Sequence, residues 1–287
     1  MIKKAVIPAA GFGTRFLPFT KAVPKEMIPL VDKPVIQYVI EEAAAAGITD
    51  ILIIVSKGKA AIQDHFNPEY SLYERLGASG KNNLLDELRA IDGLANIHYV
   101  YQQELDGLGG AVLRAKNFIG DDPFAILLGD TVTSSELKPV TAQLLDAYEK
   151  VNSPVVALEE VPWEKTNRYG VIDGKSEDGK LYKVDAFVEK PDPAEAPSNL
   201  VIASRYVFTP EIFECLERTP RGKGNEIQLT DAMLLMLKNY PMYGLKFTGK
   251  RHDIGNKLDF IKSTVEFALK RPEFREQIMA YLKQIAG

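Results

Sequence analysis

Three basic residues and two glycines gather near the start of the chain, in the segment VIPAAGFGTRFLPFTKAVPKEMIPL (6–30). Gly11 and Gly13 leave a bare backbone whose N–H groups a phosphate chain could approach closely. Arg15 and Lys25 could neutralise that chain, arginine through its planar fork and lysine as a point charge. The segment therefore predicts a site for a ligand that carries several phosphates.

Two better-known glycine motifs do not fit this segment. A dinucleotide-binding G-x-G-x-x-G motif needs a third glycine, where this chain has Phe16. It also needs a helix, but Pro18, Pro24 and Pro29 keep residues 14–30 extended or turned. A P-loop is excluded because no G-K-[ST] follows the glycines. An NAD-dependent oxidoreductase is thereby disfavoured, and GTR together with PKEM disfavours a plain glycine turn with solvated cations.

Polar residues also end two later apolar runs. Asp130 ends PFAILLGD (123–130), and Gln102 and Gln103 end IHYVYQQ (97–103). Ligands of open α/β sheets bind beyond the carboxyl ends of the strands, so these side chains are expected at one edge with the glycine loop. A carboxylate there suits Mg²⁺, although an aspartate at a strand end caps the next helix about as often.

The elements that must position these residues alternate between strand and helix. Strands are expected over 3–9, 50–56, 97–103, 123–130 and 153–161. Helical patterns occupy 36–47, 59–66, 107–119 and 134–151, and the clearest flexible insertion is 77–83. Continuous apolar strands between helices indicate a largely parallel sheet that is covered on both faces.

After about residue 160 the pattern changes. Residues 169–191 alternate and carry D-G turns, as β-hairpins do. A strand (199–208), two helices (209–219 and 226–241) and a strand with a turn (242–255) follow. Residues 257–286 look helical with an interruption at Pro272. We predict an α/β fold with a Rossmann-like mixed, mainly parallel sheet flanked by helices, a small β-hairpin part and C-terminal helices.

Composition narrows the function classes. The 287 residues carry 35 basic and 39 acidic side chains, and a net charge of −4 argues against a nucleic-acid-binding surface. The single Cys215 excludes an intramolecular disulfide and fits a reducing compartment. We find no signal peptide and no apolar run of the roughly 18 residues that a membrane span needs. We expect a cytoplasmic protein with neither nucleic-acid nor membrane partners.

The order of several motifs resembles the sugar-nucleotide pyrophosphorylase family from residue 3 to about 270. These motifs are PAAGFGTRFLP, TKAVPKEMIPLVDKPVIQYVIEEA, LLGD, VEKP, NEIQLTDA and HDIGNK. The resemblance implies the nucleotide-diphospho-sugar transferase fold. It also implies Mg²⁺-assisted transfer of a uridylyl group from UTP to glucose 1-phosphate, which yields UDP-glucose and pyrophosphate. A thymidylyl-, cytidylyl- or guanylyltransferase is the alternative within the family. A catalytically silent regulatory module is disfavoured because the charged motif residues are all present.

The resemblance assigns roles to individual residues. It implies that the catalytic residues are Arg15, Lys25, Asp130 and Lys190. It implies nucleotide contacts from Ala9, Ala10, Gly11, Gly13, Thr14, Gln102 and Gly107, with Gln102 as the uracil reader. It implies sugar-phosphate contacts from Gly170, Glu189 and Lys190, and Mg²⁺ ligands in Asp130 and Asp253.

Some details of these assignments depend on spacing. Gln102 is preferred over Gln103 because only Gln102 has the family spacing to Gly107. Adjacent side chains diverge in a strand, so Glu189 and Lys190 would both serve one site only at a strand end. Thr230 and Asp231 in NEIQLTDA are structural as readily as functional and are not assigned to the site, and His252 beside Asp253 is interpreted as structural.

The resemblance also implies a domain organisation, and the chain departs from the family pattern at two positions. It implies a catalytic domain over 1–256, with a nucleotide part to about 160 and a sugar-binding part over 161–256, then a C-terminal helical segment over 257–287. A homodimer or homotetramer is expected. Gly110 stands where the family usually has histidine, and Thr131 where a second aspartate is common.

Overall fold

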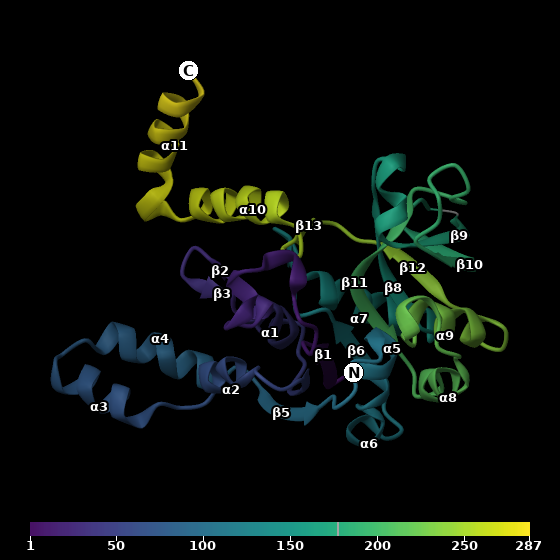
Figure 1. The fold of residues 1–287 in the computed structure, drawn as a ribbon, viewed down its shortest axis with the longest axis horizontal. Coiled ribbons are helices and arrows are strands. Elements are labelled where there is room, and N and C mark those ends of the chain that lie inside the picture. Colours follow the sequence, from purple (N-terminus) through teal and green to yellow (C-terminus); the bar gives the residue numbers. More distant parts are fainter. Residues whose placement is uncertain (177) are drawn as a thin grey trace.

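The apolar runs that the sequence places between helices form one twisted sheet in the computed structural model, which describes residues 1–176 and 178–287 (Figure 1). Within this described part, nine strands pair in the order β5-β4-β1-β6-β11-β8-β12-β10-β9. Their bounds in that order are Asn96–Tyr101, Asp50–Val55, Lys4–Pro8, Phe124–Leu127, Leu200–Phe208, Val155–Glu160, Tyr243–Lys246, Leu181–Glu189 and Gly170–Ser176.

The sheet is mixed, with most strands in one direction. β1 runs parallel to β4 and β6, β4 runs parallel to β5, and β12 runs parallel to β8. β11 is antiparallel to β6 and β8, and β10 is antiparallel to β12 and β9. Only β10 and β11 of these described strands therefore oppose the others, which confirms the mixed, mainly parallel α/β fold.

Helices cover both faces of the sheet because its central strands are apolar on both sides. In β1, Val6 packs into one core with α5 (Gly107–Leu113), α6 (Lys116–Ile119), α8 (Glu211–Arg218) and α9 (Leu229–Leu237). Its neighbours Ala5 and Ile7 pack on the opposite face with α1 (Val35–Ala45) and α2 (Ala60–Phe66). α7 (Val140–Val151) covers β8 and β11.

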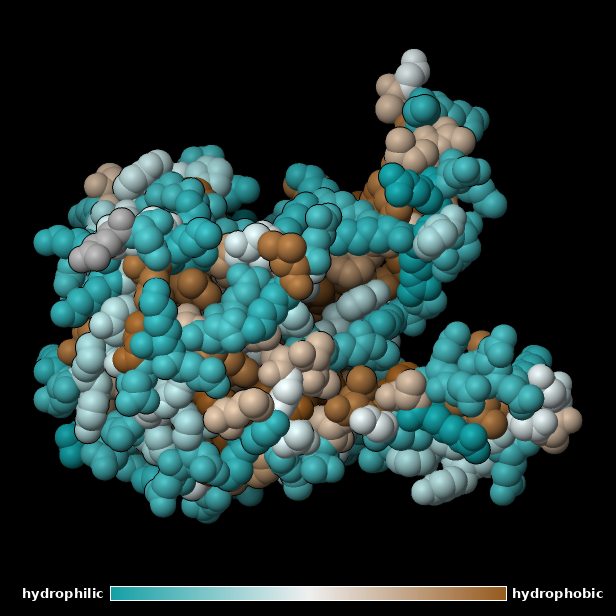
Figure 2. Space-filling model, turned by 180° about the vertical axis from the view of Figure 1, so that it is seen from behind, coloured by the Kyte–Doolittle hydropathy of each residue, from teal (hydrophilic) through white to brown (hydrophobic). Residues whose placement is uncertain are grey.

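The remaining elements lie outside this sandwich. Two small sheets are formed by β2 (Pro29–Leu30) with β3 (Lys33–Pro34), and by β7 (Thr131–Ser134) with β13 (Lys250–Asp253). α3 (Tyr70–Ala78) and α4 (Asn82–Asp92) form one projection, and α10 (Lys257–Lys270) with α11 (Pro272–Ala286) another (Figures 1 and 2). No described helix has the length and hydropathy to cross a membrane.

Two predicted helices differ from the structure. The helix expected over 134–151 begins only at Val140, because Pro139 restricts the residue before it and lacks an N–H. Thr131–Ser134 instead forms strand β7. The helix expected over 107–119 divides into α5 and α6. The proline-rich segment 14–30 contains single 3₁₀ turns at Thr14–Phe16, Phe19–Lys21 and Lys25–Met27. These turns agree with the prediction that the segment is extended or turned.

A buried ion pair connects strand β11 with helix α1. Arg205 on β11 donates from Nη2 to Glu42 Oε2 on α1 at 2.6 Å and to the carbonyl oxygen of Thr131 at 2.9 Å. The hydroxyls of Thr133 and Thr141 also donate to the Glu42 carboxylate. Burial alone would raise the pKa of Glu42, but Arg205 and the two threonine hydroxyls together lower it below its usual value. The pair thus fixes the start of β7, directly after Asp130.

We expect Arg205→Met to lower the free energy of unfolding by about 3–5 kcal/mol, because the Glu42 charge would stay buried without its cation. Urea denaturation measures this change. The control is Arg218→Met, which removes an exposed arginine 3.9 Å from Glu214 and should cost under about 1 kcal/mol. A similar small cost for both variants would contradict the role given to the buried pair.

Candidate active site

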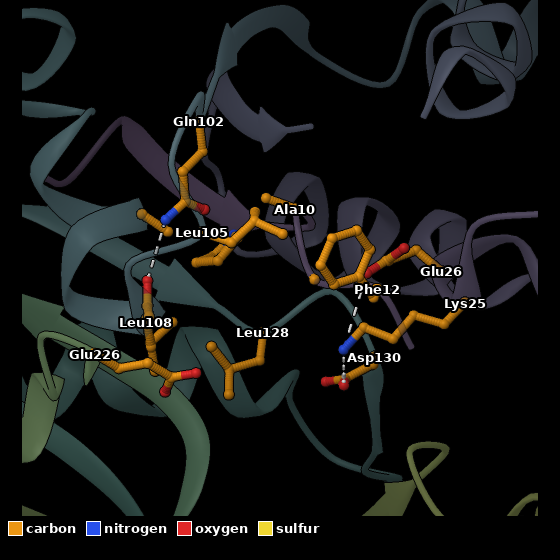
Figure 3. A pocket seen from close by; sticks show the side chains of 14 residues that line it. Ala10, Phe12, Lys25, Glu26, Gln102, Leu105, Leu108, Leu128, Asp130 and Glu226 are labelled. Carbon is orange, nitrogen blue, oxygen red and sulfur yellow. Dashed lines mark hydrogen bonds and ion pairs between the residues drawn. The ribbon is translucent and has the colours of Figure 1, made fainter. Parts of the chain in front are cut away.

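A cavity of about 450 Å³ opens beyond the carboxyl ends of β1, β5 and β6. Figure 3 shows Gln102 at one end, Lys25 with Asp130 at the other, and leucine side chains between them. The lining residues are Pro8, Ala10, Gly11, Phe12, Lys25, Glu26, Gln102, Leu105, Gly107, Leu108, Ala111, Leu128, Asp130 and Glu226. The glycine loop, Gln102 and Asp130 thus share the edge that the sequence predicts.

The glycine loop folds back against the stem of Lys25. Gly13 has a left-handed φ of 67°, and a Cβ there would lie 2.9 Å from Lys25 Cβ. A Cβ on Gly11 would lie 3.9 Å from Lys25 Nζ. The Thr20 hydroxyl donates to the Gly13 carbonyl at 2.8 Å and closes the loop. Glycine is needed at position 13 both for the backbone angle and for the close approach of Lys25.

Lys25 pairs with Asp130 across the mouth of the cavity, with 2.5 Å between Nζ and Oδ2. Burial alone would lower the pKa of Lys25, but the carboxylates of Asp130 and Glu26 together raise it above its usual value. Burial would likewise raise the pKa of Asp130, and Lys25 lowers it instead. Both groups are therefore charged at neutral pH, and each compensates the other in the absence of a ligand.

A second ion pair, which the sequence analysis did not find, supports the same loop. Lys59 donates from Nζ to Glu26 Oε2 and to the Gly11 carbonyl oxygen, both at 2.8 Å. Glu26 is fully buried, and burial raises its pKa against the opposing effects of Lys25 and Lys59. Lys59 thus holds one peptide of the glycine loop from α2. Its sequence position, at the start of an ordinary amphipathic helix, gave no signal of this role.

Asp253 reaches the Asp130 end through strand pairing, because its partner in the β13–β7 register is Thr131. Gly255 shows the convergence of three charged groups. A Cβ on Gly255 would lie 3.1 Å from Asp253 Oδ1, 3.6 Å from Asp130 Oδ2 and 3.6 Å from Arg15 Nη1. Arg15, Asp130 and Asp253, which were predicted from separate motifs, therefore lie around one small space beside Gly255.

These two carboxylates fit a divalent cation that prefers oxygen. Mg²⁺ commonly takes one or two protein carboxylates and completes its octahedron with phosphate oxygens and water. The space beside Gly255 lies against both Asp130 and Asp253. In residues 1–176 and 178–287 no cluster of three or more histidine, cysteine, aspartate or glutamate side chains has the arrangement of a metal site. Asp130 and Asp253 are the two carboxylates that could hold such a cation beside a phosphate ligand.

Thr131, one of the two departures from the family pattern, is held by hydrogen bonds within the chain. Its side chain is buried, and its hydroxyl lies 3.3 Å from the Ser204 hydroxyl and 3.5 Å from Asp130 Oδ1. Its carbonyl oxygen accepts from Arg205. Thr131 thus anchors the backbone that follows Asp130.

A second polar cluster lies at the end of β10, outside the cavity lining. Glu189 pairs in register with Gly170, and a Cβ on Gly170 would lie 3.4 Å from Glu189 Oε2. Lys190 has a φ of 46°, which turns its side chain toward Glu189, with 2.7 Å between Nζ and Oε1. The Thr230 hydroxyl donates to Glu189 Oε2 at 2.7 Å. Thr230, whose role the sequence leaves open, therefore orients Glu189, a predicted sugar-binding residue.

The predicted nucleotide contacts occupy different positions around the cavity. Gln102 is buried at the lining, whereas Gln103 is exposed. Gly107 has a φ of 93°, and a Cβ there would lie 2.6 Å from Glu226 Cβ. Ala10 and Gly11 line the cavity, but the other three predicted residues of the loop do not: Ala9, which is buried behind it, Gly13 and Thr14.

Comparison with known proteins places these features in a family. Two relatives are named UTP–glucose-1-phosphate uridylyltransferase. The Staphylococcus epidermidis protein is 52% identical over 99% of this chain and 98% of its own length. The Bacillus subtilis protein is 51% identical over 98% of this chain and 96% of its own length.

Solved structures agree with these relatives. A UDP-glucose pyrophosphorylase complexed with UDP-glucose is 42% identical, with a TM-score of 0.87, and covers 94% of this chain and 100% of that chain. A UTP-bound enzyme of the same kind from Acinetobacter baumannii is 35% identical, with a TM-score of 0.92, and covers 98% and 99%. The nucleotidyl transferase model matches residues 4–269. The family predicted from the motifs is confirmed: the chain belongs to the nucleotidyl transferases.

Proposed function

We propose that the chain transfers a uridylyl group from UTP to glucose 1-phosphate and forms UDP-glucose and pyrophosphate. The observation that carries this proposal is the convergence of Arg15, Lys25, Asp130 and Asp253 beside the glycine loop. The names of the relatives, at about half identity over nearly the whole chain, support the choice of substrates.

The reaction joins two polyanions and needs no covalent intermediate with the protein. A phosphate oxygen of glucose 1-phosphate attacks the α-phosphorus of UTP, the new P–O bond forms, and the bond to pyrophosphate breaks. Positioning and electrostatic stabilisation supply the rate. In this mechanism Lys25 and Arg15 neutralise the triphosphate and the charge that develops on the leaving group, while the N–H groups of the glycine loop contact the phosphates.

The two carboxylates have a separate task. Asp130 and Asp253 would hold a divalent cation, which we propose is Mg²⁺. When bound, the cation neutralises phosphate oxygens of the nucleotide. Because Lys25 pairs with Asp130 without ligand, the ammonium group must exchange that contact for a phosphate when the nucleotide enters. The ion pair therefore keeps both charged groups in place before the substrate arrives.

The sugar phosphate is assigned to the cluster at the end of β10. Glu189 would accept hydrogen bonds from sugar hydroxyls, and Lys190 would pair with the phosphate. Gly170 would contact the sugar through its backbone, since a Cβ there would lie only 3.0 Å from Ile202 Cδ1 and 3.4 Å from Glu189 Oε2. We accordingly propose that residues up to about 160 bind the nucleotide and residues 161–256 the sugar phosphate.

The C-terminal helices are assigned to contacts between copies, in a homodimer or homotetramer. α11 buries none of its residues in the single chain. It projects from the body (Figure 2) and exposes Phe274, Met279, Tyr281 and Ile285.

The proposed function is tested by measuring pyrophosphate release with Mg²⁺ over a panel of nucleoside triphosphates and sugar 1-phosphates. We expect UTP with glucose 1-phosphate to be among the best pairs in kcat/KM. The panel should include TTP, CTP, GTP and ATP, and the 1-phosphates of galactose and mannose. If another nucleotide or sugar is clearly preferred, the substrate assignment is wrong.

We expect Gly13→Ala to lower kcat/KM for UTP by about tenfold or more, because the added Cβ would displace Lys25. Electrostatic stabilisation of a transition state by one such group contributes a factor on the order of 10² or more to the rate. Gly80→Ala is the matched control, with a similar φ of 69° and no atom within 4 Å of the added Cβ. Both variants should lose some stability from backbone strain. Equal activity losses in the two would contradict the role of Gly13 in placing Lys25.

A further inference from the structure

The amide of Gln102 is held by a buried carboxylate. Asp106 lies directly before α5, at the position where an aspartate normally accepts a hydrogen bond from the first turn of the helix. Its side chain makes no such capping bond, and the Gly109 N–H donates to the Ile227 carbonyl instead. Asp106 Oδ1 accepts from Gln102 Nε2 at 2.7 Å. The Asp106 side chain therefore orients Gln102 and does not cap the helix.

Gly110 makes this arrangement possible. A Cβ at position 110 would lie 1.9 Å from Asp106 Oδ1, 2.3 Å from Cγ and 2.7 Å from Oδ2. Real Cβ atoms do not approach other atoms so closely, so any other residue at 110 would expel the carboxylate from its place. The family-typical histidine would do so too. The buried position of Asp106 thus depends on a residue by which this chain departs from its family's pattern.

The contact with Asp106 fixes which end of the Gln102 amide faces the ligand. Nε2 donates to Asp106 Oδ1 and, at 3.3 Å, to the Gly107 carbonyl oxygen, so both of its protons have acceptors. A flipped amide would bring Oε1 against a carboxylate oxygen, which places two acceptors together. The Arg114 guanidinium lies 3.5 Å from Asp106 Oδ2, on the side of the carboxylate away from Gln102 Nε2. Oε1 is therefore the atom that Gln102 can offer to a base.

An acceptor at this point discriminates between pyrimidines. The N3 atom of uracil carries a proton and can donate to Oε1, whereas N3 of cytosine is itself an acceptor. Thymine has the same O2, N3–H and O4 groups as uracil. Two facing acceptors cost enough to change relative rates by roughly 10- to 100-fold. A locked Oε1 therefore accepts uracil or thymine and rejects cytosine.

We propose that Asp106 and Gly110 are positioning residues that lock the Gln102 amide and so select a base with an N3–H group. This inference rests on the proposed function, in which Gln102 reads the base of the nucleotide. Asp106 acts through Gln102 and is not itself a catalytic residue, and Gly110 acts by leaving room for Asp106.

The test is the ratio of kcat/KM for UTP to that for CTP, measured with Mg²⁺ and glucose 1-phosphate. In Asp106→Asn the amide partner can accept or donate, so both orientations of Gln102 become possible. We expect the UTP/CTP ratio to fall by about tenfold or more, while the UTP/TTP ratio stays within about twofold. A ratio within one variant is independent of the amount of folded enzyme. A loosened cavity would change both ratios.

Glu104→Gln is the matched control, because it removes an exposed charge from the same loop, where Glu104 contacts Arg221. Its UTP/CTP ratio should equal that of the wild type. Gly110→Ala should lower the ratio as Asp106→Asn does. In an Asp106→Ala background, however, Gly110→Ala should cause no further change, because the carboxylate that it displaces is gone.

The outcomes separate this inference from the proposed function. If the wild-type enzyme does not prefer UTP to CTP, the proposed nucleotide specificity is wrong. If it does prefer UTP but Asp106→Asn keeps the wild-type ratio, the amide lock is overturned. If Gly110→Ala lowers the ratio equally with and without Asp106, the role of Gly110 is overturned.

Discussion

The ion pair between Lys25 and Asp130 is the contact around which the candidate site is arranged. It joins the glycine loop after β1 to the end of β6, and these segments meet because their strands are parallel neighbours. Asp253 is delivered to the same point by the pairing of β13 with β7. A site for polyanions needs cations, and the pair balances the buried charges of Lys25 and Asp130 before any ligand enters.

Two buried ion pairs hold the irregular segments on which this site lies. Glu26 with Lys59 supports the glycine loop, and Glu42 with Arg205 supports the backbone after Asp130. Neither segment has a long helix or strand to fix its shape, so directional contacts to charged groups must do so. Burying a charge is costly unless it is paired, and the same pairs therefore make these positions sensitive to single substitutions.

The sequence predicts the family, the mixed sheet and the edge at which the cavity opens, because apolar runs and motif residues carry strong local signals. Gln102 directly follows β5 and Asp130 lies three residues beyond the end of β6, so a rule about strand ends locates them. The roles of Lys59, Asp106 and Arg205 were not predicted. Each depends on a hydrogen-bond or ion-pair partner that the folded chain brings close, and no local sequence pattern marks that partner. α3 and α4 escaped because the glycines and asparagines of 77–83 indicated a flexible insertion, whereas residues 77–78 end α3 and residues 82–83 begin α4.

The most direct test of the site is Asp130→Asn, with turnover and UTP binding measured separately. With Mg²⁺, turnover should fall on the order of 10² or more. Without Mg²⁺, calorimetry should show UTP binding that is equal to or tighter than that of the wild type, because Lys25 is released from its ion pair. Near-wild-type turnover, or a loss of metal-free UTP binding, would contradict the account in which Asp130 holds the cation and Lys25 the phosphates.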